Sequence, residues 1–130
     1  MFFDKSNVNL ETIIAKSADL TNKPYLHSVI DNKGGFDIDN KELDITLKIL
    51  CRDIDGKRVE RNDLELEIFR SNGDIVIVIA KLNFPDEPIL WSGTKVLWMD
   101  SNSGKKCKPP NYFFTLENLA NRIKSFMVKN

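Results

Sequence analysis

The sequence contains a single histidine, His27, and two cysteines, Cys51 and Cys107, among 130 residues. The cysteines lie far apart and form no close pair with each other or with the histidine, so there is no disulfide framework and no metal-binding cluster. We expect two reduced thiols and no metal or other cofactor. No nucleophile motif surrounds either cysteine, which argues against a histidine-dependent enzyme. We interpret His27 as a partly buried side chain that hydrogen-bonds the backbone.

Net charge is also absent, because lysine plus arginine and aspartate plus glutamate both number 19. No global field therefore draws the chain toward nucleic acid or an anionic membrane. The longest apolar run, residues 75–80, is too short to cross a bilayer, and the first residues lack the basic and apolar regions of a secretory signal. We therefore expect a cytoplasmic protein without membrane association.

Loops that bind phosphate or calcium are missing as well. Residues 34–35 are a glycine pair, but no predicted helix follows them. Residues 53–56 resemble the centre of a calcium loop, yet Cys51 and Asn62 would then occupy the first-ligand and bidentate-glutamate positions. The oxygen-bearing residues 100–104 lack a later acidic ligand, and we interpret them as a hairpin turn.

Helical periodicity is present near both ends. Apolar residues at helical spacing predict a helix over 9–20 that Asn9 caps, and another over 116–128 that Thr115 caps. Between them, residues 24–30 fit either a short helix or a strand, and the polar run 31–35 ends this segment. The apolar stripe of the last helix consists of Leu116, Leu119, Ala120, Ile123, Phe126 and Met127.

Alternating apolar and polar residues predict strands over 43–51, 64–68 and 75–82. The dipeptide Asn72-Gly73 is a strong hairpin signal. Its register pairs Arg70 with Ile75, Ile68 with Ile77 and Leu66 with Ile79 on the core face, and Phe69 with Val76, Glu67 with Val78 and Glu65 with Ala80 on the other face. Residues 89–99 predict a fourth strand, or two strands with Ser92-Gly93 as a bulge or a tight turn between them.

This order of elements predicts one α+β domain over residues 1–130. We expect an N-terminal helix, a curved antiparallel meander of about four strands and a C-terminal helix, in a cystatin-like or similar arrangement. A hydrophobic fraction of 42% is enough for one core without a metal or disulfide staple.

Aromatic residues supply the candidate binding site. Trp91 and Trp98 flank a segment next to Asp100. Because tryptophans commonly anchor ligand pockets and protein interfaces, these three residues are the predicted binding site. The alternative is that both tryptophans are ordinary core residues. A second segment places Lys105, Lys106 and Lys108 before Tyr112, Phe113 and Phe114, which is the best nucleic-acid signal. The charge balance argues against that function, and aromatic residues before a helix commonly hold it to the core.

Several C-terminal segments resemble short uncharacterised cyanobacterial proteins. They are Pro88-Ile89-Leu90-Trp91-Ser92-Gly93, Val96-Leu97-Trp98-Met99-Asp100, Ser103-Gly104-Lys105-Lys106-Cys107 and Pro109-Pro110. The resemblance covers about a third of the chain, implies a cytoplasmic setting, and transfers no activity and no functional residues.

These observations favour a non-catalytic binding or assembly module. The alternative is a small-ligand-binding protein or an enzyme whose pocket the curved sheet encloses, with Trp91 or Trp98 as a wall. The expected partner is another protein or a second copy of the chain, because the hairpin register leaves Phe69, Val76 and Val78 away from the main core. A short helix over 24–30 is the other candidate cover for these side chains.

Overall fold

The computed structural model describes residues 10–30 and 42–129, with side chains up to residue 127. The predicted cap Asn9 and the polar run 31–35 lie outside the described residues. The elements are α2 (Leu10–Thr21), β1 (Leu26–Ile30), β2 (Asp44–Arg52), the 3-10 helix η1 (Glu60–Asn62), β3 (Leu64–Ser71), β4 (Asp74–Lys81), β5 (Ile89–Ser92), β6 (Val96–Met99) and α3 (Phe113–Lys129).

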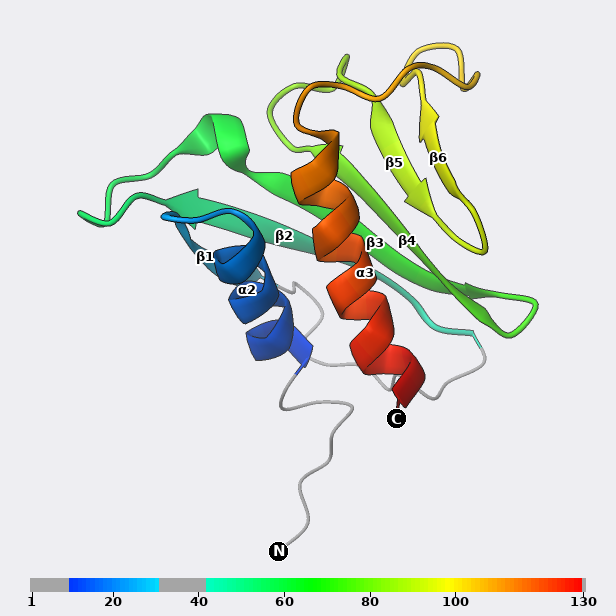
Figure 1. Cartoon of the computed structure of the whole chain (residues 1–130), viewed down its shortest axis with the longest axis horizontal. Coiled ribbons are helices and arrows are strands. Elements are labelled where there is room, and N and C mark those ends of the chain that lie inside the picture. Colours follow the sequence, from blue (N-terminus) through cyan, green and yellow to red (C-terminus); the bar gives the residue numbers. More distant parts are fainter. Residues whose placement is uncertain (1–9, 31–41, 130) are drawn as a thin grey trace, which may run out of the picture.

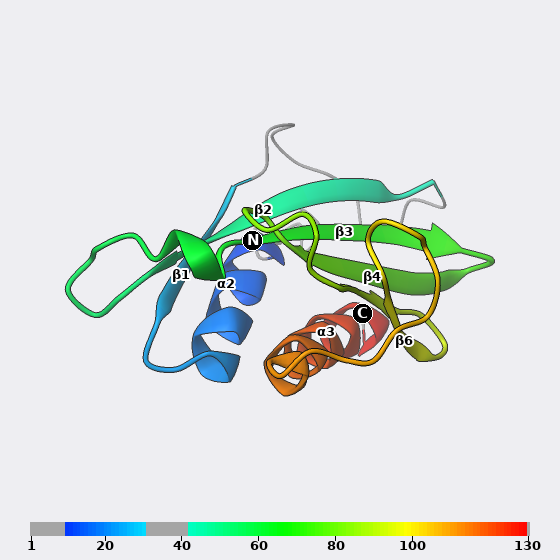
Figure 2. The ribbon, with the colours of Figure 1, turned by 90° about the horizontal axis from the view of Figure 1, so that it is seen from above.

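The strands form one antiparallel sheet whose spatial order follows the chain order from β1 to β6. Helices α2 and α3 lie side by side against one face of this sheet (Figures 1 and 2). The predicted α+β architecture, with a helix before and a helix after an antiparallel meander, is confirmed. No helix among the described residues has the length and apolar content needed to span a bilayer.

The core lies between the sheet and the two helices. Leu43 and the alternate residues of β2 from Ile45 to Cys51 are buried, as the sequence pattern predicts. The apolar stripe of α3 covers them from the other side, and of its predicted members only Phe126 is partly exposed rather than buried. Burial of these two surfaces against each other stabilises the fold by the hydrophobic effect.

The β3–β4 hairpin has the predicted register at each of its pairs. Ile68 lies opposite Ile77 on the core face, and Phe69 lies opposite Val76 on the other face. Asn72 and Gly73 have φ angles of 54° and 86°, the left-handed conformation that a two-residue hairpin turn needs at both positions. Because asparagine and glycine tolerate this conformation, the turn fixes the register of the whole pair.

The number of strands differs from the expected four. Residues 26–30 form the edge strand β1 rather than a helix, with His27 and Val29 facing the core side while Leu26 and Ile30 are exposed. Residues 89–99 form two strands, because the chain turns after Ser92, where the Gly93 N–H donates to the Lys95 carbonyl (3.1 Å). These two changes account for the six-stranded sheet.

Helix α3 begins at Phe113, so Thr115 lies inside the first turn and the prediction that it caps the helix is wrong. The Phe113 N–H donates to the Pro110 carbonyl (3.0 Å), which starts the turn earlier than the side-chain pattern suggested. Phe113 and Phe114 are 39% and 66% exposed, so they do not hold the helix to the core. The preceding Tyr112 packs against the core instead.

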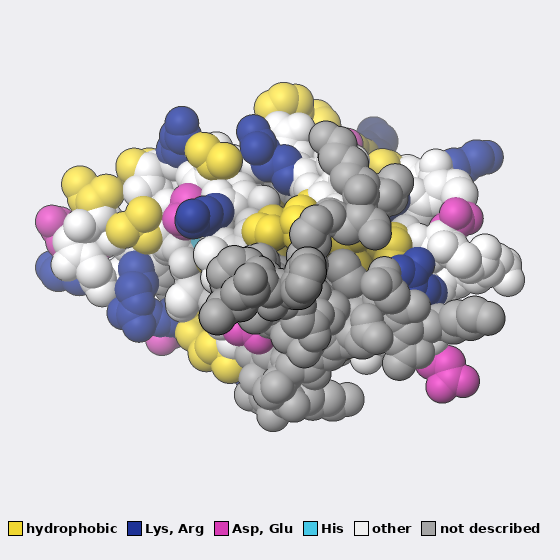
Figure 3. All heavy atoms as spheres, turned by 90° about the horizontal axis from the view of Figure 1, so that it is seen from below, with side chains coloured by type: hydrophobic (Ala, Val, Ile, Leu, Met, Phe, Trp, Pro, Cys, Tyr) yellow, Lys and Arg dark blue, Asp and Glu magenta, His cyan; other side chains and the backbone are white. Residues whose placement is uncertain are grey.

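We call the face of the sheet that points away from α2 and α3 the open face. A helix over 24–30, one of the two candidate covers, does not form, because residues 26–30 are strand β1. The Trp91 ring on β5 instead meets the Phe69 ring edge-on, with centroids 6.0 Å apart. Figure 3 views the molecule from below and not onto the open face; among the coloured residues there, hydrophobic, basic and acidic side chains are interspersed.

Candidate functional site

A small cavity of about 80 Å³ lies where the C-terminal end of α2 meets the N-terminal end of α3 over the sheet. Seven of its lining side chains carry hydrogen-bonding groups, and the other four are apolar. The lining residues are Ala18, Thr21, Asn22, His27, Asn62, Leu64, Lys81, Tyr112, Thr115, Leu116 and Leu119.

Strand alternation brings two of these polar residues to the helix side of the sheet. His27 lies on the same face of β1 as Val29, and Lys81 continues the face of β4 that carries Ile77 and Ile79. Asn62 ends the short helix η1, just before β3. The polar wall is therefore assembled from elements that are distant in the sequence.

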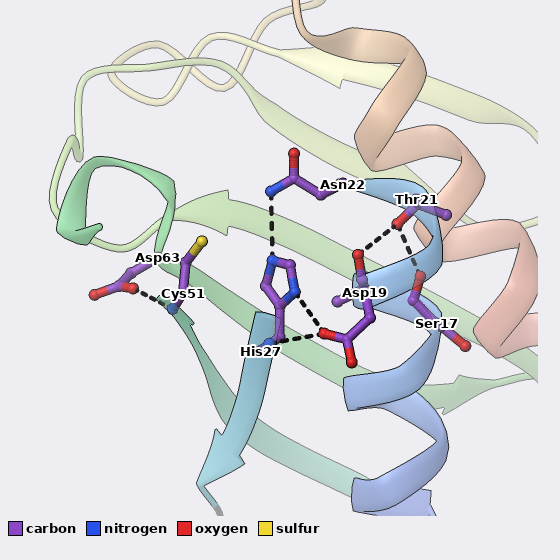
Figure 4. Close-up of polar contacts among 8 residues, drawn as sticks. Ser17, Asp19, Thr21, Asn22, His27, Cys51 and Asp63 are labelled. Atoms are coloured by element: carbon purple, nitrogen blue, oxygen red, sulfur yellow. Dashed lines mark hydrogen bonds and ion pairs between the residues drawn. The ribbon is translucent and has the colours of Figure 1, made fainter. Parts of the chain in front are cut away.

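The His27 imidazole is held by two side chains from the end of α2 (Figure 4). Its Nδ1 lies 2.9 Å from Asp19 Oδ1, which also accepts the His27 backbone N–H at 2.7 Å. Its Nε2 lies 3.3 Å from the Asn22 amide nitrogen. Because a carboxylate oxygen accepts, the geometry assigns a proton to Nδ1, and Nε2 is then the acceptor for the Asn22 amide. The interpretation that the imidazole hydrogen-bonds the backbone is wrong, because both ring partners are side chains.

Cys51 lies directly opposite His27 in the β1–β2 pair and is fully buried. Burial raises the pKa of its thiol, and this effect exceeds the opposing hydrogen bond from the Asn62 side chain. A buried neutral thiol is a poor nucleophile, because the thiolate is the reactive form. Cys51 is not a lining residue of the cavity, so this cysteine–histidine pair lacks the access that covalent catalysis needs.

Tyr112 and Lys81 form the opposite wall. The Tyr112 hydroxyl is buried and has no hydrogen-bond partner among the residues that the structure describes. The Lys81 ammonium lies 4.6 Å from the centroid of the Tyr112 ring and 3.2 Å from the Arg61 carbonyl oxygen, to which it donates. Burial raises the pKa of Tyr112 to about 12 and lowers the pKa of Lys81. Both shifts reflect polar groups that have left water without full compensation.

The structure places the predicted site residues on different surfaces. Trp98 faces the helices, is buried, and meets the Tyr112 ring edge-on with centroids 6.5 Å apart. Trp91 lies on the open face with 36% of its surface exposed. Asp100 accepts the N–H groups of Asn102 and Ser103 at 2.9 Å, and these bonds lower its pKa. The three residues are therefore not brought together, and none of them lines the cavity.

The aspartates of the two oxygen-rich segments have local structural roles. Asp53 accepts the N–H groups of Asp55 and Lys57, each at 2.9 Å, as Asp100 does in its own turn. This pattern confirms that residues 100–104 form a turn. Within the described ranges 10–30 and 42–129, no group of three or more histidine, cysteine or acidic side chains is placed to hold a metal ion.

The sequence drew attention to two of the cavity residues, but for other reasons. His27 stood out as the single histidine, and Tyr112 as part of a basic and aromatic segment. Lys105, Lys106 and Lys108 of that segment are exposed, while the Tyr112 ring is turned toward the core. Lys81 carried no signal, because a lysine at a strand end is an ordinary solvated residue. Asn62 drew attention only as the residue that breaks the calcium-loop pattern.

The fold and the cavity define a class: an α+β protein with two helices on one face of a six-stranded meander and a cavity between the C-terminal end of α2 and the N-terminal end of α3. Residues 11–126 match the family described as Domain of unknown function (DUF8659). The chain belongs to this family. The match extends well beyond the C-terminal segments that resemble cyanobacterial proteins, and it carries no information on a cyanobacterial source. No curated protein and no solved structure matches the chain.

Proposed function

We propose that this chain is a non-catalytic binding domain that takes a small polar ligand into the cavity between α2, α3 and the sheet. The observation that carries the proposal is the Tyr112 hydroxyl, which is buried at the cavity wall without a partner in the described part of the chain. An unsatisfied buried hydroxyl costs about 1–3 kcal/mol. A ligand atom within hydrogen-bonding distance would remove that cost.

Binding fits the site better than catalysis does. Both ring nitrogens of His27 are engaged, by Asp19 and Asn22, so the imidazole is not poised to take a proton from a substrate. The Cys51 thiol is buried outside the cavity. The Thr21 hydroxyl of the wall donates to the Ser17 carbonyl (2.9 Å), so its proton is held by the backbone and not by a general base.

The proposal is tested by blocking the cavity. Thr115 lines it from α3 without being fully buried, so Thr115→Met fills the space while leaving the core stripe intact. Ligands found by a thermal-shift screen of small metabolites should raise the melting temperature of the wild type but not of Thr115→Met. The matched control is Thr12→Met, at an exposed position of α2. Ligands that stabilise both variants equally bind elsewhere and would contradict the proposal.

An assembly function is the second candidate, and the open face favours it. Phe69 and Val78 are half-buried, and Trp91 is exposed, on neighbouring strands β3, β4 and β5. Such a cluster is suited to burial against another protein surface, because each large apolar side chain gains roughly 1.5–3 kcal/mol on full burial. The sedimentation experiment described in the Discussion tests this function.

A further inference from the structure

We infer that the ligand of the cavity is a small carboxylate anion, held by the Lys81 ammonium and the Tyr112 hydroxyl. This inference rests on the proposed function and names the ligand class for the same site. It follows from three properties of the cavity: the charge of its wall, the balance of donors and acceptors, and its size.

The wall carries a cation without an anionic partner. Lys81 is half-buried, and no carboxylate of the described residues forms an ion pair with its ammonium. Its contacts there are the Arg61 carbonyl and the Tyr112 ring. The charge of Glu87, a smaller effect than burial, raises the pKa of both Lys81 and Tyr112, but Glu87 is exposed, forms no ion pair with Lys81 and does not line the cavity. A half-buried ammonium in this setting is stabilised by an anion that enters the cavity.

Two donor groups on the same wall, the Lys81 ammonium and the Tyr112 hydroxyl, lack a full set of acceptors among the described residues. The Lys81 ammonium has three N–H donors and uses one on the Arg61 carbonyl. The Tyr112 hydroxyl adds a donor that no described residue accepts. The strong acceptor nearby, the Asp19 carboxylate, is taken up by His27. A ligand that brings two acceptor oxygens and a negative charge matches this imbalance, whereas an ammonium compound would meet a like charge.

The volume limits the ligand to a few atoms. An apolar cavity of roughly 150 Å³ can hold benzene, and a single water needs roughly 10–15 Å³. The volume of about 80 Å³ therefore suits about three or four non-hydrogen atoms, the size of formate or acetate. The carboxylate of a longer acid fits only if its chain leaves through the mouth of the cavity.

The inference is tested with acetate and acetamide, which share one shape and differ in charge. Each is titrated into the ¹⁵N-labelled full-length chain at constant ionic strength, with formate, butyrate, methylammonium and chloride as further probes. We expect saturable binding of acetate and formate that moves the amide signals around Tyr112 and is at least about tenfold tighter than that of acetamide. Butyrate that binds as tightly as acetate identifies the end of a larger acid as the ligand, and butyrate that does not identifies a free small acid.

Two variants connect the binding to the named groups. Tyr112→Phe removes only the hydroxyl, and Lys81→Met removes the charge at similar length; each should weaken acetate binding at least about tenfold. Their controls are Tyr25→Phe, at the chain's other tyrosine, and Lys48→Met, at an exposed strand lysine of the open face; neither residue lines the cavity. Melting temperatures near that of the wild type confirm that the variants fold, and Lys81→Gln replaces Lys81→Met if the latter does not.

The outcomes distinguish a failure of the carboxylate assignment from a failure of the proposed binding function. Acetamide binding that equals acetate binding and is lost in Thr115→Met would leave the binding function standing and overturn the anion assignment. Acetate binding that is unchanged in both Tyr112→Phe and Lys81→Met would place the anion elsewhere and overturn the inference. If none of the probes gives saturable shifts around Tyr112, the cavity holds water only and the carboxylate assignment is wrong, while the metabolite screen still decides the wider binding function.

Discussion

The indole N–H of Trp98 on β6 donates to the Glu117 carboxylate on α3 across 2.8 Å. This bond fixes the last strand of the sheet to the last helix and satisfies a donor that is buried with the tryptophan. Tyr112 packs on the same indole ring, so the bond also positions one wall of the cavity.

Replacement of Glu117 by leucine should destabilise the fold, because the buried Trp98 N–H would lose its acceptor. We expect a loss of about 1–3 kcal/mol in the free energy of unfolding, measured by urea denaturation. Glu117→Gln keeps an acceptor for the Trp98 N–H, so its free energy of unfolding should fall by less. The control Arg122→Leu places leucine on the exposed side of the same helix. If Glu117→Leu is no less stable than this control, the bond does not contribute to stability.

Asp63 should be one of the most sensitive polar positions of the chain. It is 2% exposed, accepts the Cys51 backbone N–H (2.8 Å), and pairs with the Arg58 guanidinium. Asp63→Ala leaves the buried Cys51 N–H unpaired and removes the partner of the partly exposed Arg58 guanidinium, so we expect a loss of about 2–3 kcal/mol in the free energy of unfolding. Asp86→Ala, at an exposed loop residue, should change it by less than about 0.5 kcal/mol. Equal stabilities would show that the pair is dispensable.

Stability should depend on pH through Glu67 on the open face. Burial and the neighbouring carboxyls of Asp44 and Glu65 raise the pKa of Glu67 to about 7. A pKa raised by folding adds stability that is fully present below the unfolded value, about 4.5, and is lost as the pH rises through 7. Because Glu67 is partly solvated, screening reduces the effect to the order of 1 kcal/mol.

Glu67→Gln tests this dependence, because glutamine resembles the protonated acid at every pH. The variant should be more stable than the wild type at pH 8, and the difference should vanish below about pH 4.5. Glu60→Gln, at an exposed residue of η1, serves as the control. A stability difference that stays the same from pH 4 to pH 8 would mean that Glu67 does not titrate in this range.

The two cysteines should react differently with a thiol reagent. Both are free in the structure, with Cys51 buried and Cys107 partly exposed. Because burial also raises the pKa of Cys51, the folded protein should show one reacting thiol, and the denatured protein two. Cys107→Ser should abolish the reaction of the folded protein while leaving one thiol after denaturation. Fast reaction of both thiols before unfolding would contradict the buried position of Cys51.

Self-association through the open face should depend on pH as well. A two-fold contact there would bring the acidic group of Asp44, Glu65 and Glu67 close to its own copy, so protonation of Glu67 should favour the dimer. We expect sedimentation at high protein concentration to show more dimer at pH 5 than at pH 8. Replacing both Val76 and Val78 with threonine should reduce the dimer without unfolding the sheet. A wild type that stays monomeric at both pH values would exclude this contact.

Local patterns in the sequence determined much of the fold. The period of two in β2 and β3 and the Asn72-Gly73 turn specified which side chains face the core, because alternation and turn geometry act over a few neighbouring residues. The stripe of α3 did the same for the last helix. The sequence pattern did not specify the first residue of α3. The helix begins at Phe113 because the Phe113 N–H donates to the Pro110 carbonyl, and not because a side chain caps it.

The tertiary structure decided the conformation of the edge strand β1 and the position of the cavity. Residues 24–30 fit two conformations, and pairing with β2 made them a strand, since the backbone groups of this short segment find partners there. Trp91 and Trp98 looked like one site, but they lie on neighbouring strands, each opposite a leucine, and they point to opposite faces of the sheet. Lys81, Asn62 and His27 were unrelated in the sequence and converge on one cavity. The hydrophobic pattern of the sequence indicates on which face of a helix or strand a residue lies. Only the packing of elements that are distant in the sequence decides which polar side chains are buried next to one another.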